Sequence, residues 1–209
     1  MGGAIFSQFF LLTLYMQQVL HYSAIKTGVA YIGLTLTIIA FSAVAQALTT
    51  RIGVRRVLSA GLALSTVALV LFARLPVHGH YFADLFPAFL ISGVGLALAF
   101  VPMSIGALTG VRQSDAGIAS GLINTSQQIG GAIGVAAATT IATTFTANYV
   151  SVHAGTTAFS GSALTHGFQI AFYALAGLAA LGAVLAAALV ESEPQAPELE
   201  LAVELEAAA

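Results

Sequence analysis

Charged residues are scarce in this sequence. Only 7% of its 209 residues are Asp, Glu, Lys or Arg, whereas 58% are hydrophobic. A soluble domain carries about 25% charged residues, because its surface must be hydrated. A chain with so few charges cannot cover a water-facing shell, so most of it must be surrounded by lipid. The sequence therefore predicts an all-α membrane protein.

Other absences narrow the possible functions. The chain has no cysteine, which excludes a disulfide framework and a thiolate metal site. It has no phosphate-binding loop, and Gly93-x-Gly95 lies inside an apolar stretch and follows no strand, so ATP-driven transport and nucleotide binding are not expected. No nucleophile-elbow motif occurs, and the length leaves no room for a catalytic domain. We therefore expect neither an enzyme nor a cofactor.

A metal site and a nucleic-acid partner are not expected either. His78-Gly-His80 supplies two ligands in a loop, fewer than the three or four that zinc requires. The net charge is -2, and nucleic-acid binding domains are typically basic.

Six stretches are long and apolar enough to cross a bilayer, which takes about 20 residues each. They run approximately over Gly2–Leu20, Thr27–Thr50, Val57–Ala73, Leu85–Gly110, Gly117–Ala147 and Gly167–Val190. The last break, Asn148–His166, is rich in Ser, Thr and Gly, which favour loops. Residues 1–190 are thus predicted to form one six-helix transmembrane domain. The remaining Glu191–Ala209, with six glutamates and two prolines, is predicted to be an acidic cytoplasmic tail.

The basic residues predict the orientation. If both termini are cytoplasmic, the inner loops carry four of them, and only Lys26 and Arg74 lie outside; the four are Arg51, Arg55, Arg56 and Arg112. This distribution agrees with the positive-inside rule. We therefore expect a multi-pass protein with both termini cytoplasmic.

The fifth apolar stretch carries small and polar residues at steps of three or four, so they share a helix face. One stripe comprises Gly117, Gly121, Asn124, Gln128, Gly131 and Val135, and an overlapping one Ser120, Gln127, Gly130 and Gly134. Small residues let helices approach closely in lipid. A buried amide without a partner costs about 1–3 kcal/mol. This face is therefore expected to meet another helix or a water-filled cavity.

Two other stretches have notable residues. The fourth carries Gly93, Gly95, Pro102 and Gly106, which predicts a kink near the proline and either flexing or plain packing. In the first, Gln8 and Tyr15 lie seven residues apart on one face, and Gln17 lies near the outer end. The candidate cavity residues are therefore Gln8, Tyr15, Gln17, Asn124, Gln127 and Gln128.

Two of these stretches resemble a known family. Gly93-Val-Gly-Leu-Ala-Leu-Ala-Phe-Val-Pro102 is followed by Ala116-Gly-Ile-Ala-Ser-Gly-Leu-Ile-Asn-Thr-Ser-Gln-Gln-Ile-Gly-Gly-Ala-Ile-Gly-Val135. This order is similar to the penultimate region of the bacterial fourteen-span drug:proton antiporters of the major facilitator superfamily. Tyr15-Met-Gln17, His21-Tyr-Ser and Gly28 resemble an outer segment of the same family. The resemblance covers residues 1–190 and implies the last six helices, one half-bundle of that fold.

A cytoplasmic loop carries the third point of resemblance. Arg51-Ile-Gly53-Val-Arg55-Arg56 is similar to the second copy of the family's D-R-x-G-R-R motif, but Thr50 occupies the acidic position. Topology anchoring is therefore the simplest role for these arginines, with a gating contact as the alternative.

The resemblance implies a carboxy-terminal transporter half for multidrug efflux in the bacterial plasma (inner) membrane. Its partners would be the lipid bilayer, an amphipathic or cationic small molecule and an amino-terminal half. In residues 1–190 the carboxylates are Asp84 and Asp115, and both lie at predicted helix starts, where capping explains them. The family's membrane-embedded acidic residue and antiporter motif are absent from this chain. A self-pairing six-span facilitator and a non-transporting scaffold or remnant remain the alternatives.

Overall fold

The computed structural model describes residues 1–108 and 110–190, so the predicted tail lies outside the described residues. Every regular element in these two ranges is helical. The helices are α1 (Gly2–Leu14), α2 (Ala24–Ala30), α3 (Ile32–Ile52), α4 (Val54–Phe72), α5 (Phe86–Leu108), α6 (Ala116–Val152) and α7 (Gly161–Leu189). Two π-helical turns, η1 (Tyr15–Val19) and η2 (Tyr81–Leu85), extend α1 and precede α5. The prediction of an all-helical fold is confirmed.

Within the described residues, five helical stretches are long and apolar enough to cross a membrane: Ala24–Ile52, Val54–Phe72, Tyr81–Leu108, Ala116–Val152 and Gly161–Leu189. They correspond to the second to sixth predicted spans. The first span folds as 13 residues of α1 and five of η1. Its crossing of the bilayer stays a prediction.

The last two helices are longer than predicted and leave only residues 153–160 as their loop. Polar residues extend the helices here because their side chains bond to backbone atoms three residues away. Ser151 Oγ donates to Asn148 O at 2.8 Å, and Ser160 Oγ accepts from Ala163 N at the start of α7. The 37 residues of α6 measure about 55 Å, so this helix exceeds the hydrocarbon thickness of about 30 Å.

Local sequence also sets the breaks between helices. Ser23 caps α2 by accepting a hydrogen bond from Lys26 N at 3.2 Å. Gly53 separates α3 from α4 with φ 87° and ψ 156°, a conformation essentially restricted to glycine. The tight cytoplasmic connection predicted between these helices therefore depends on this residue.

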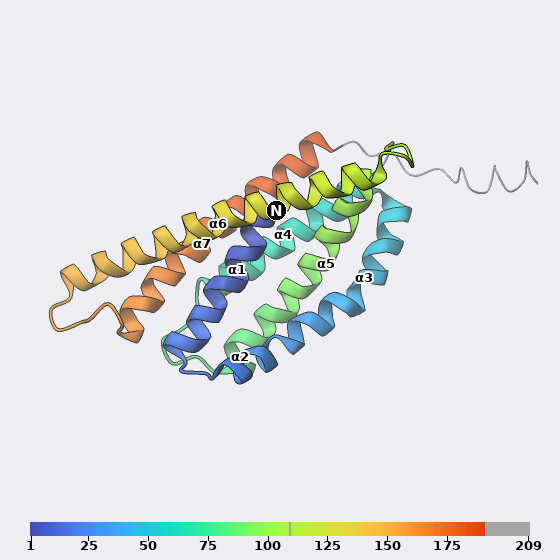
Figure 1. Cartoon of the computed structure of the whole chain (residues 1–209). Coiled ribbons are helices and arrows are strands. Elements are labelled where there is room, and N and C mark those ends of the chain that lie inside the picture. Colours follow the sequence, from blue (N-terminus) through green and yellow to red (C-terminus); the bar gives the residue numbers. More distant parts are fainter. Residues whose placement is uncertain (109, 191–209) are drawn as a thin grey trace, which may run out of the picture.

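The helices form one open bundle (Figure 1). α4 packs along α5 and α7, α3 lies beside α5, and α6 lies against both α7 and α1. The amino terminus lies partway along α6. α3 and α6 are the least buried of the five candidate spans. One long face of each helix is thus left without a neighbour in the described chain.

A chain of five aromatic rings crosses the bundle interior. Phe9 of α1 contacts Tyr31, which contacts Phe89 of α5, with ring centroids 5.4 and 5.5 Å apart. Phe72 of α4 then joins Phe89 to Phe172 of α7 at 5.7 and 5.8 Å. These separations are typical of favourable aromatic pairs. The rings therefore connect α1, α4, α5, α7 and the α2–α3 junction in one core.

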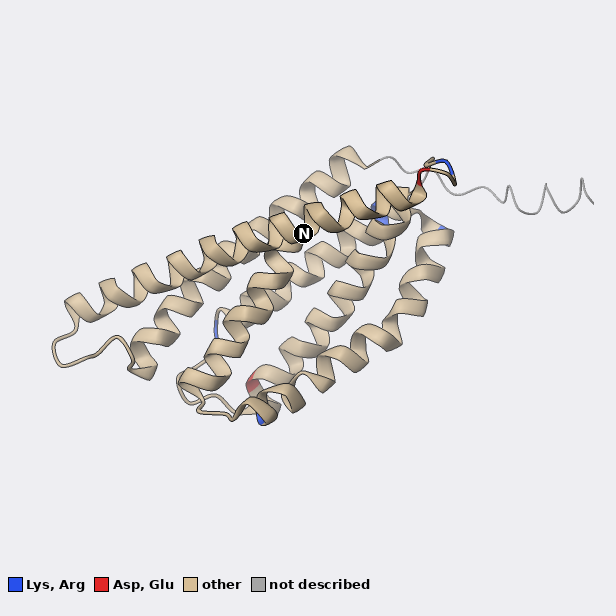
Figure 2. Cartoon of the chain, viewed as in Figure 1, with Lys and Arg blue, Asp and Glu red and all other residues tan. Residues whose placement is uncertain are grey.

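Charged residues lie only at helix ends and in connections, within the part of the chain that the structure describes (Figure 2). Large apolar side chains instead cover the outside of the bundle, as Ile39 of α3, Leu122 of α6 and Val184 of α7 illustrate. A soluble monomer does not expose apolar surface on this scale. The fold is that of a membrane protein, as the composition predicts.

Candidate functional site

Glycines let α1 and α6 approach closely. A Cβ added to Gly2 would lie 2.5 Å from the carbonyl oxygen of Gln127, and one added to Gly3 would lie 2.9 Å from that of Gly130. A Cβ on Gly134 would overlap the Cα of Gly3. Such contact between backbones is how small residues drive helix association in lipid. The crossing therefore fixes how α1 lies on the polar stripe of α6.

Beside this crossing, the polar stripe of α6 is open. Asn124 and Gln128 are exposed and Gln127 is half-buried. Gln128 borders a shallow groove together with Phe6 of α1 and Gly131, which lies under the Phe6 ring. Neither the Asn124 nor the Gln128 side chain makes a hydrogen bond within the described residues. The amides of this face are available to a ligand, to water or to another chain.

Gln8, by contrast, is buried inside the bundle, with only 2% of its surface exposed. Its Nε2 donates to Ser92 Oγ of α5 at 2.7 Å, a bond between two buried side chains. Hydrogen bonds of this kind hold membrane helices together. The structure thus places Gln8 apart from Asn124 and Gln128.

Tyr15 is also buried, and its hydroxyl donates to the backbone oxygen of Pro76 at 2.6 Å. Gln169 of α7 donates to the adjacent Leu75 O at 3.0 Å. Both acceptors lie just beyond the end of α4, in the connection to η2. Side chains from two other helices therefore anchor this connection. Gln17, in η1, is exposed.

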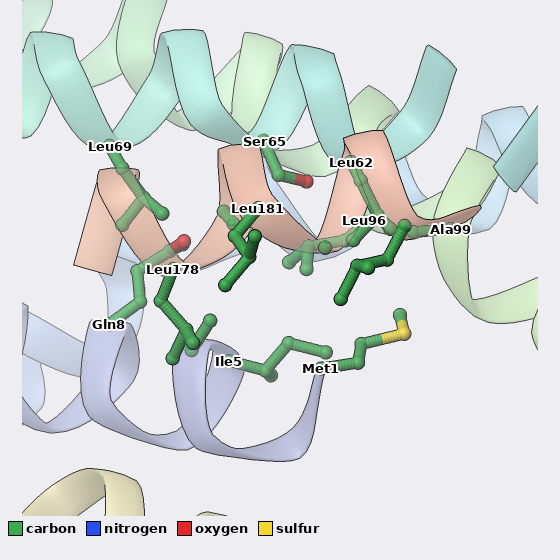
Figure 3. A pocket seen from close by; sticks show the side chains of 14 residues that line it. Met1, Ile5, Gln8, Leu62, Ser65, Leu69, Leu96, Ala99, Leu178 and Leu181 are labelled. Atoms are coloured by element: carbon green, nitrogen blue, oxygen red, sulfur yellow. The ribbon is translucent and has the colours of Figure 1, made fainter. Parts of the chain in front are cut away.

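One cavity adjoins Gln8 between α1, α4, α5 and α7 (Figure 3). Its volume is about 250 Å³, and its wall is mostly leucine and alanine. The polar residues in the wall are Gln8 and Ser65, whose buried Oγ has no hydrogen-bond partner within the described chain. The cavity is therefore apolar, with one polar side chain from α1 and one from α4.

The predicted packing residues of α5 face two neighbouring helices. A Cβ on Gly93 would lie 2.7 Å from the Thr37 Cβ of α3, and one on Gly95 would lie 2.7 Å from Ser65 Oγ of α4. Pro102 is buried within α5, and a Cβ on Gly106 would lie 3.0 Å from Val54 of α4.

On α6, Gly117 and Gly121 have no atom within 4 Å of an added Cβ, unlike Gly130 and Gly134. The α1 crossing thus uses only one of the two predicted pairs of small residues.

The arginine motif at the α3–α4 connection is exposed. Arg51, Arg55 and Arg56 flank Gly53 and are exposed, and none forms an ion pair within the residues that the structure describes. The nearby α5–α6 connection does hold one, Arg112 Nε to Asp115 Oδ2 at 3.5 Å.

Within the described residues the other carboxylate is Asp84, which accepts a hydrogen bond from His80 N at 2.7 Å at the start of η2. Both carboxylates of the described residues thus have a local partner at a helix start.

Sequence reasoning missed three polar residues. Ser92 lies singly in an apolar stretch, and Ser65 lies in another with only Thr66 beside it. Tyr31 bonds through its hydroxyl to Phe9 O at 2.9 Å and Thr13 Oγ1 at 3.0 Å. The position of Ser92 next to Gly93, in a helix expected to pack closely, could have indicated that Ser92 faces a neighbouring helix. Nothing in the local pattern identifies its partner, 84 residues away.

Comparison with known proteins is consistent with this geometry. The chain is 33% identical over 197 residues to the puromycin resistance protein pur8 of Streptomyces alboniger, covering 93% of this chain and 39% of that protein. It is 32% identical to the lincomycin resistance protein of Streptomyces lincolnensis, covering 65% and 28%. The cephamycin export protein CmcT of Amycolatopsis lactamdurans is 35% identical, covering 63% and 27%.

The chain spans about two fifths or less of the length of these relatives. The sequence profile of the Major Facilitator Superfamily matches residues 1–208, almost the whole chain. Together with the apolar helical bundle, this match shows that the chain is a multi-pass membrane protein belonging to the Major Facilitator Superfamily.

Proposed function

We propose that this chain forms one half of a secondary transporter of the drug-efflux type and supplies one wall of its substrate cavity. The exposed polar face of α6 is the observation that carries the proposal. Asn124 and Gln128 lie on a membrane-spanning helix without a hydrogen-bond partner in the described chain. Placing an unpaired amide in hydrocarbon costs about 1–3 kcal/mol. This face therefore suits a wet cavity better than lipid.

The relatives support the efflux type, since their names refer to resistance to puromycin and lincomycin and to export of cephamycin. Because the chain spans only part of such proteins, the transporting assembly includes an amino-terminal half. α3 and α6, the least buried candidate spans, offer the surface for it. The substrate is an amphipathic or cationic small molecule, drawn from the bilayer or the cytoplasm.

In this proposal, the residues that couple transport to an ion gradient belong to the amino-terminal half. Ionisable residues within spans are the usual ion carriers. In the described ranges the carboxylates are Asp84 and Asp115, and each has a local partner at a helix start. The chain's own role is binding and gating in the inner membrane, with both termini cytoplasmic. No catalytic step and no cofactor belong to it.

Reconstitution tests this proposal. Vesicles containing the chain alone, the chain with the first eight spans of a related transporter, or neither are loaded with ethidium, and a proton gradient is imposed. We expect ethidium transport only when both halves are present. Transport by the chain alone would indicate a self-pairing facilitator, and no transport with any partner would indicate a non-transporting scaffold; either result overturns the proposal.

The cavity wall is tested separately in the assembled protein. Asn124→Leu and Gln128→Leu each remove an amide from the open face, and we expect ethidium transport to fall about tenfold, as loss of a hydrogen bond of about 1.4 kcal/mol implies. Thr140→Leu is the matched control, because Thr140 is exposed on another face of α6 and bonds only to Ala136 O. Equal transport by all three variants at equal expression would mean that the stripe only packs.

A further inference from the structure

A second cavity lies at the end of the bundle that is predicted to face outward, where residues of α1 and η1 line it together with the hairpin of α6 and α7. Its volume is about 290 Å³. Leu11 and Phe168 contribute to its apolar floor, and Phe159 lies on the α6–α7 loop, with 87% of its surface exposed. Neither the sequence motifs nor the proposed function uses this cavity.

Threonines give the α6 wall a defined hydrogen-bonding character. Thr139 Oγ1 donates to Val135 O at 2.7 Å, Thr143 Oγ1 to Thr139 O at 2.9 Å, and Thr146 Oγ1 to Ala142 O at 2.8 Å. Each hydroxyl proton is thus used inside the helix, while the oxygen retains acceptor capacity. The wall presents methyl groups and hydrogen-bond acceptors.

Gln18 completes the polar lining from the opposite side. It is exposed and lies in the π-helical turn η1, and its side chain makes no hydrogen bond within the described residues. π-helical turns inside helices frequently mark functional sites. Gln18 and the threonines thus line the cavity from two different elements, η1 and α6.

The lining also limits the charge of a ligand. No residue that lines the cavity is charged. An anion would meet acceptor oxygens, and a cation would lose its hydration without a carboxylate in return. Ligand pockets usually measure about 300–1,000 Å³, so this one suits a bicyclic aromatic molecule or one end of a larger compound.

From these features we propose that this outer cavity is a binding site for uncharged amphipathic molecules that donate hydrogen bonds. The apolar floor holds the hydrocarbon body, and the ligand's hydroxyl or amide N–H donates to the threonine oxygens. The site follows the spacing of the α6 polar stripe outward, since Thr139, Ala142 and Thr146 continue it at steps of three and four residues. Binding here does not depend on transport.

The absence of cysteine allows a direct test in the full chain. Thr143→Cys places a single thiol in the cavity wall, and its alkylation by a maleimide is followed in lipid nanodiscs. Three probes of one shape are compared: 2-naphthol, 2-methoxynaphthalene without the donor, and anionic 2-naphthoate. We expect 2-naphthol to protect the thiol at concentrations about three- to tenfold lower than the methoxy compound needs, and 2-naphthoate to give no protection.

Two controls separate specific binding from partition into lipid. Ala137→Cys is exposed on α6, does not line the cavity and has no cavity-lining residue three or four positions away, so no probe should protect it. Thr139→Val in the Thr143→Cys chain keeps the side-chain volume but removes an acceptor, and should weaken protection by 2-naphthol while leaving 2-methoxynaphthalene unchanged. Equal protection by 2-naphthol and 2-methoxynaphthalene would mean that the hydrogen-bond donor does not matter and that any hydrocarbon, including lipid, fills the pocket. This result in the Thr143→Cys chain alone would overturn the proposal.

Discussion

At the scale of single residues, two buried polar side chains of the first span bond to distant parts of the chain. Gln8 bonds to Ser92, and Tyr15 bonds to the backbone oxygen of Pro76. Since no water is present in hydrocarbon, such groups must be satisfied by the protein. These bonds therefore contribute to the arrangement of helices, which is a different task from contacting a substrate.

Tyr15→Phe tests this structural task. The substitution keeps the ring in the core and removes only the donor to Pro76 O. Hydrogen bonds between membrane helices average about 0.6 kcal/mol and reach about 1.7 kcal/mol. We expect the protein in detergent to be destabilised within this range, seen as a lower midpoint of thermal unfolding.

Tyr173→Phe is the control for this change. Tyr173 is 46% exposed on α7, and its hydroxyl makes no hydrogen bond in the part of the chain that the structure describes. Its removal should leave the midpoint unchanged. If both variants unfold at the wild-type midpoint, the Tyr15 hydroxyl has no role in stability.

The candidate site could be predicted only in part from the sequence. The helical period correctly places Gln8 and Tyr15 on one face of the first helix, and both side chains are buried. It cannot say whether that face meets protein or a cavity, because their partners lie 84 and 61 residues away. The roles predicted for Asn124, Gln127 and Gln128 stay predictions, although the structure leaves the first and last exposed.

At the scale of helices, glycines act according to what lies opposite them. The added Cβ atoms of Gly134 and Gly121 differ in surroundings: the first would overlap Gly3 of α1, and the second would meet nothing within 4 Å. Gly121 and Gly134, two glycines of the same helix, therefore have different structural roles.

Gly134→Ala and Gly121→Ala form a matched pair that measures this difference. At Gly134 the methyl group must push α1 away, and overpacking costs about 1–3 kcal/mol. At Gly121 the methyl group enters open space, and alanine is the better helix former by up to about 1 kcal/mol. We expect a lower unfolding midpoint for the first and an equal or higher midpoint for the second. Equal destabilisation by the two would refute the close α1–α6 crossing.

The helices themselves were predictable because length and hydropathy specify them. The positions of the helix ends were harder to predict. The fifth predicted span ends at Ala147, whereas α6 continues to Val152, since Ser151 bonds back to Asn148 and does not interrupt the helix. The π-helical turns η1 and η2 have no signature in the hydropathy pattern, because they preserve composition and change only the backbone register.

At the scale of the whole molecule, the charges define two ends. Every charged residue of the described ranges lies near a helix end, which leaves the middle of the bundle uncharged. Bilayer hydrocarbon requires this arrangement, since a charge at its centre costs about 2.5–3.5 kcal/mol even on insertion scales. The end holding Arg51, Arg55, Arg56 and Arg112 is therefore the one expected to face the cytoplasm.

Single cysteines in the cysteine-free chain test this orientation. His78→Cys lies between α4 and η2, Gln113→Cys lies between α5 and α6, and both positions are exposed. In intact bacteria a membrane-impermeant maleimide should label the first and should reach the second only after permeabilisation. The reverse pattern would invert the orientation. Labelling of both from outside would mean that α5, the one long helix between them, does not cross the membrane. Because the unmodified chain has no thiol, it serves as the blank, and any difference between the two sites reports topology directly.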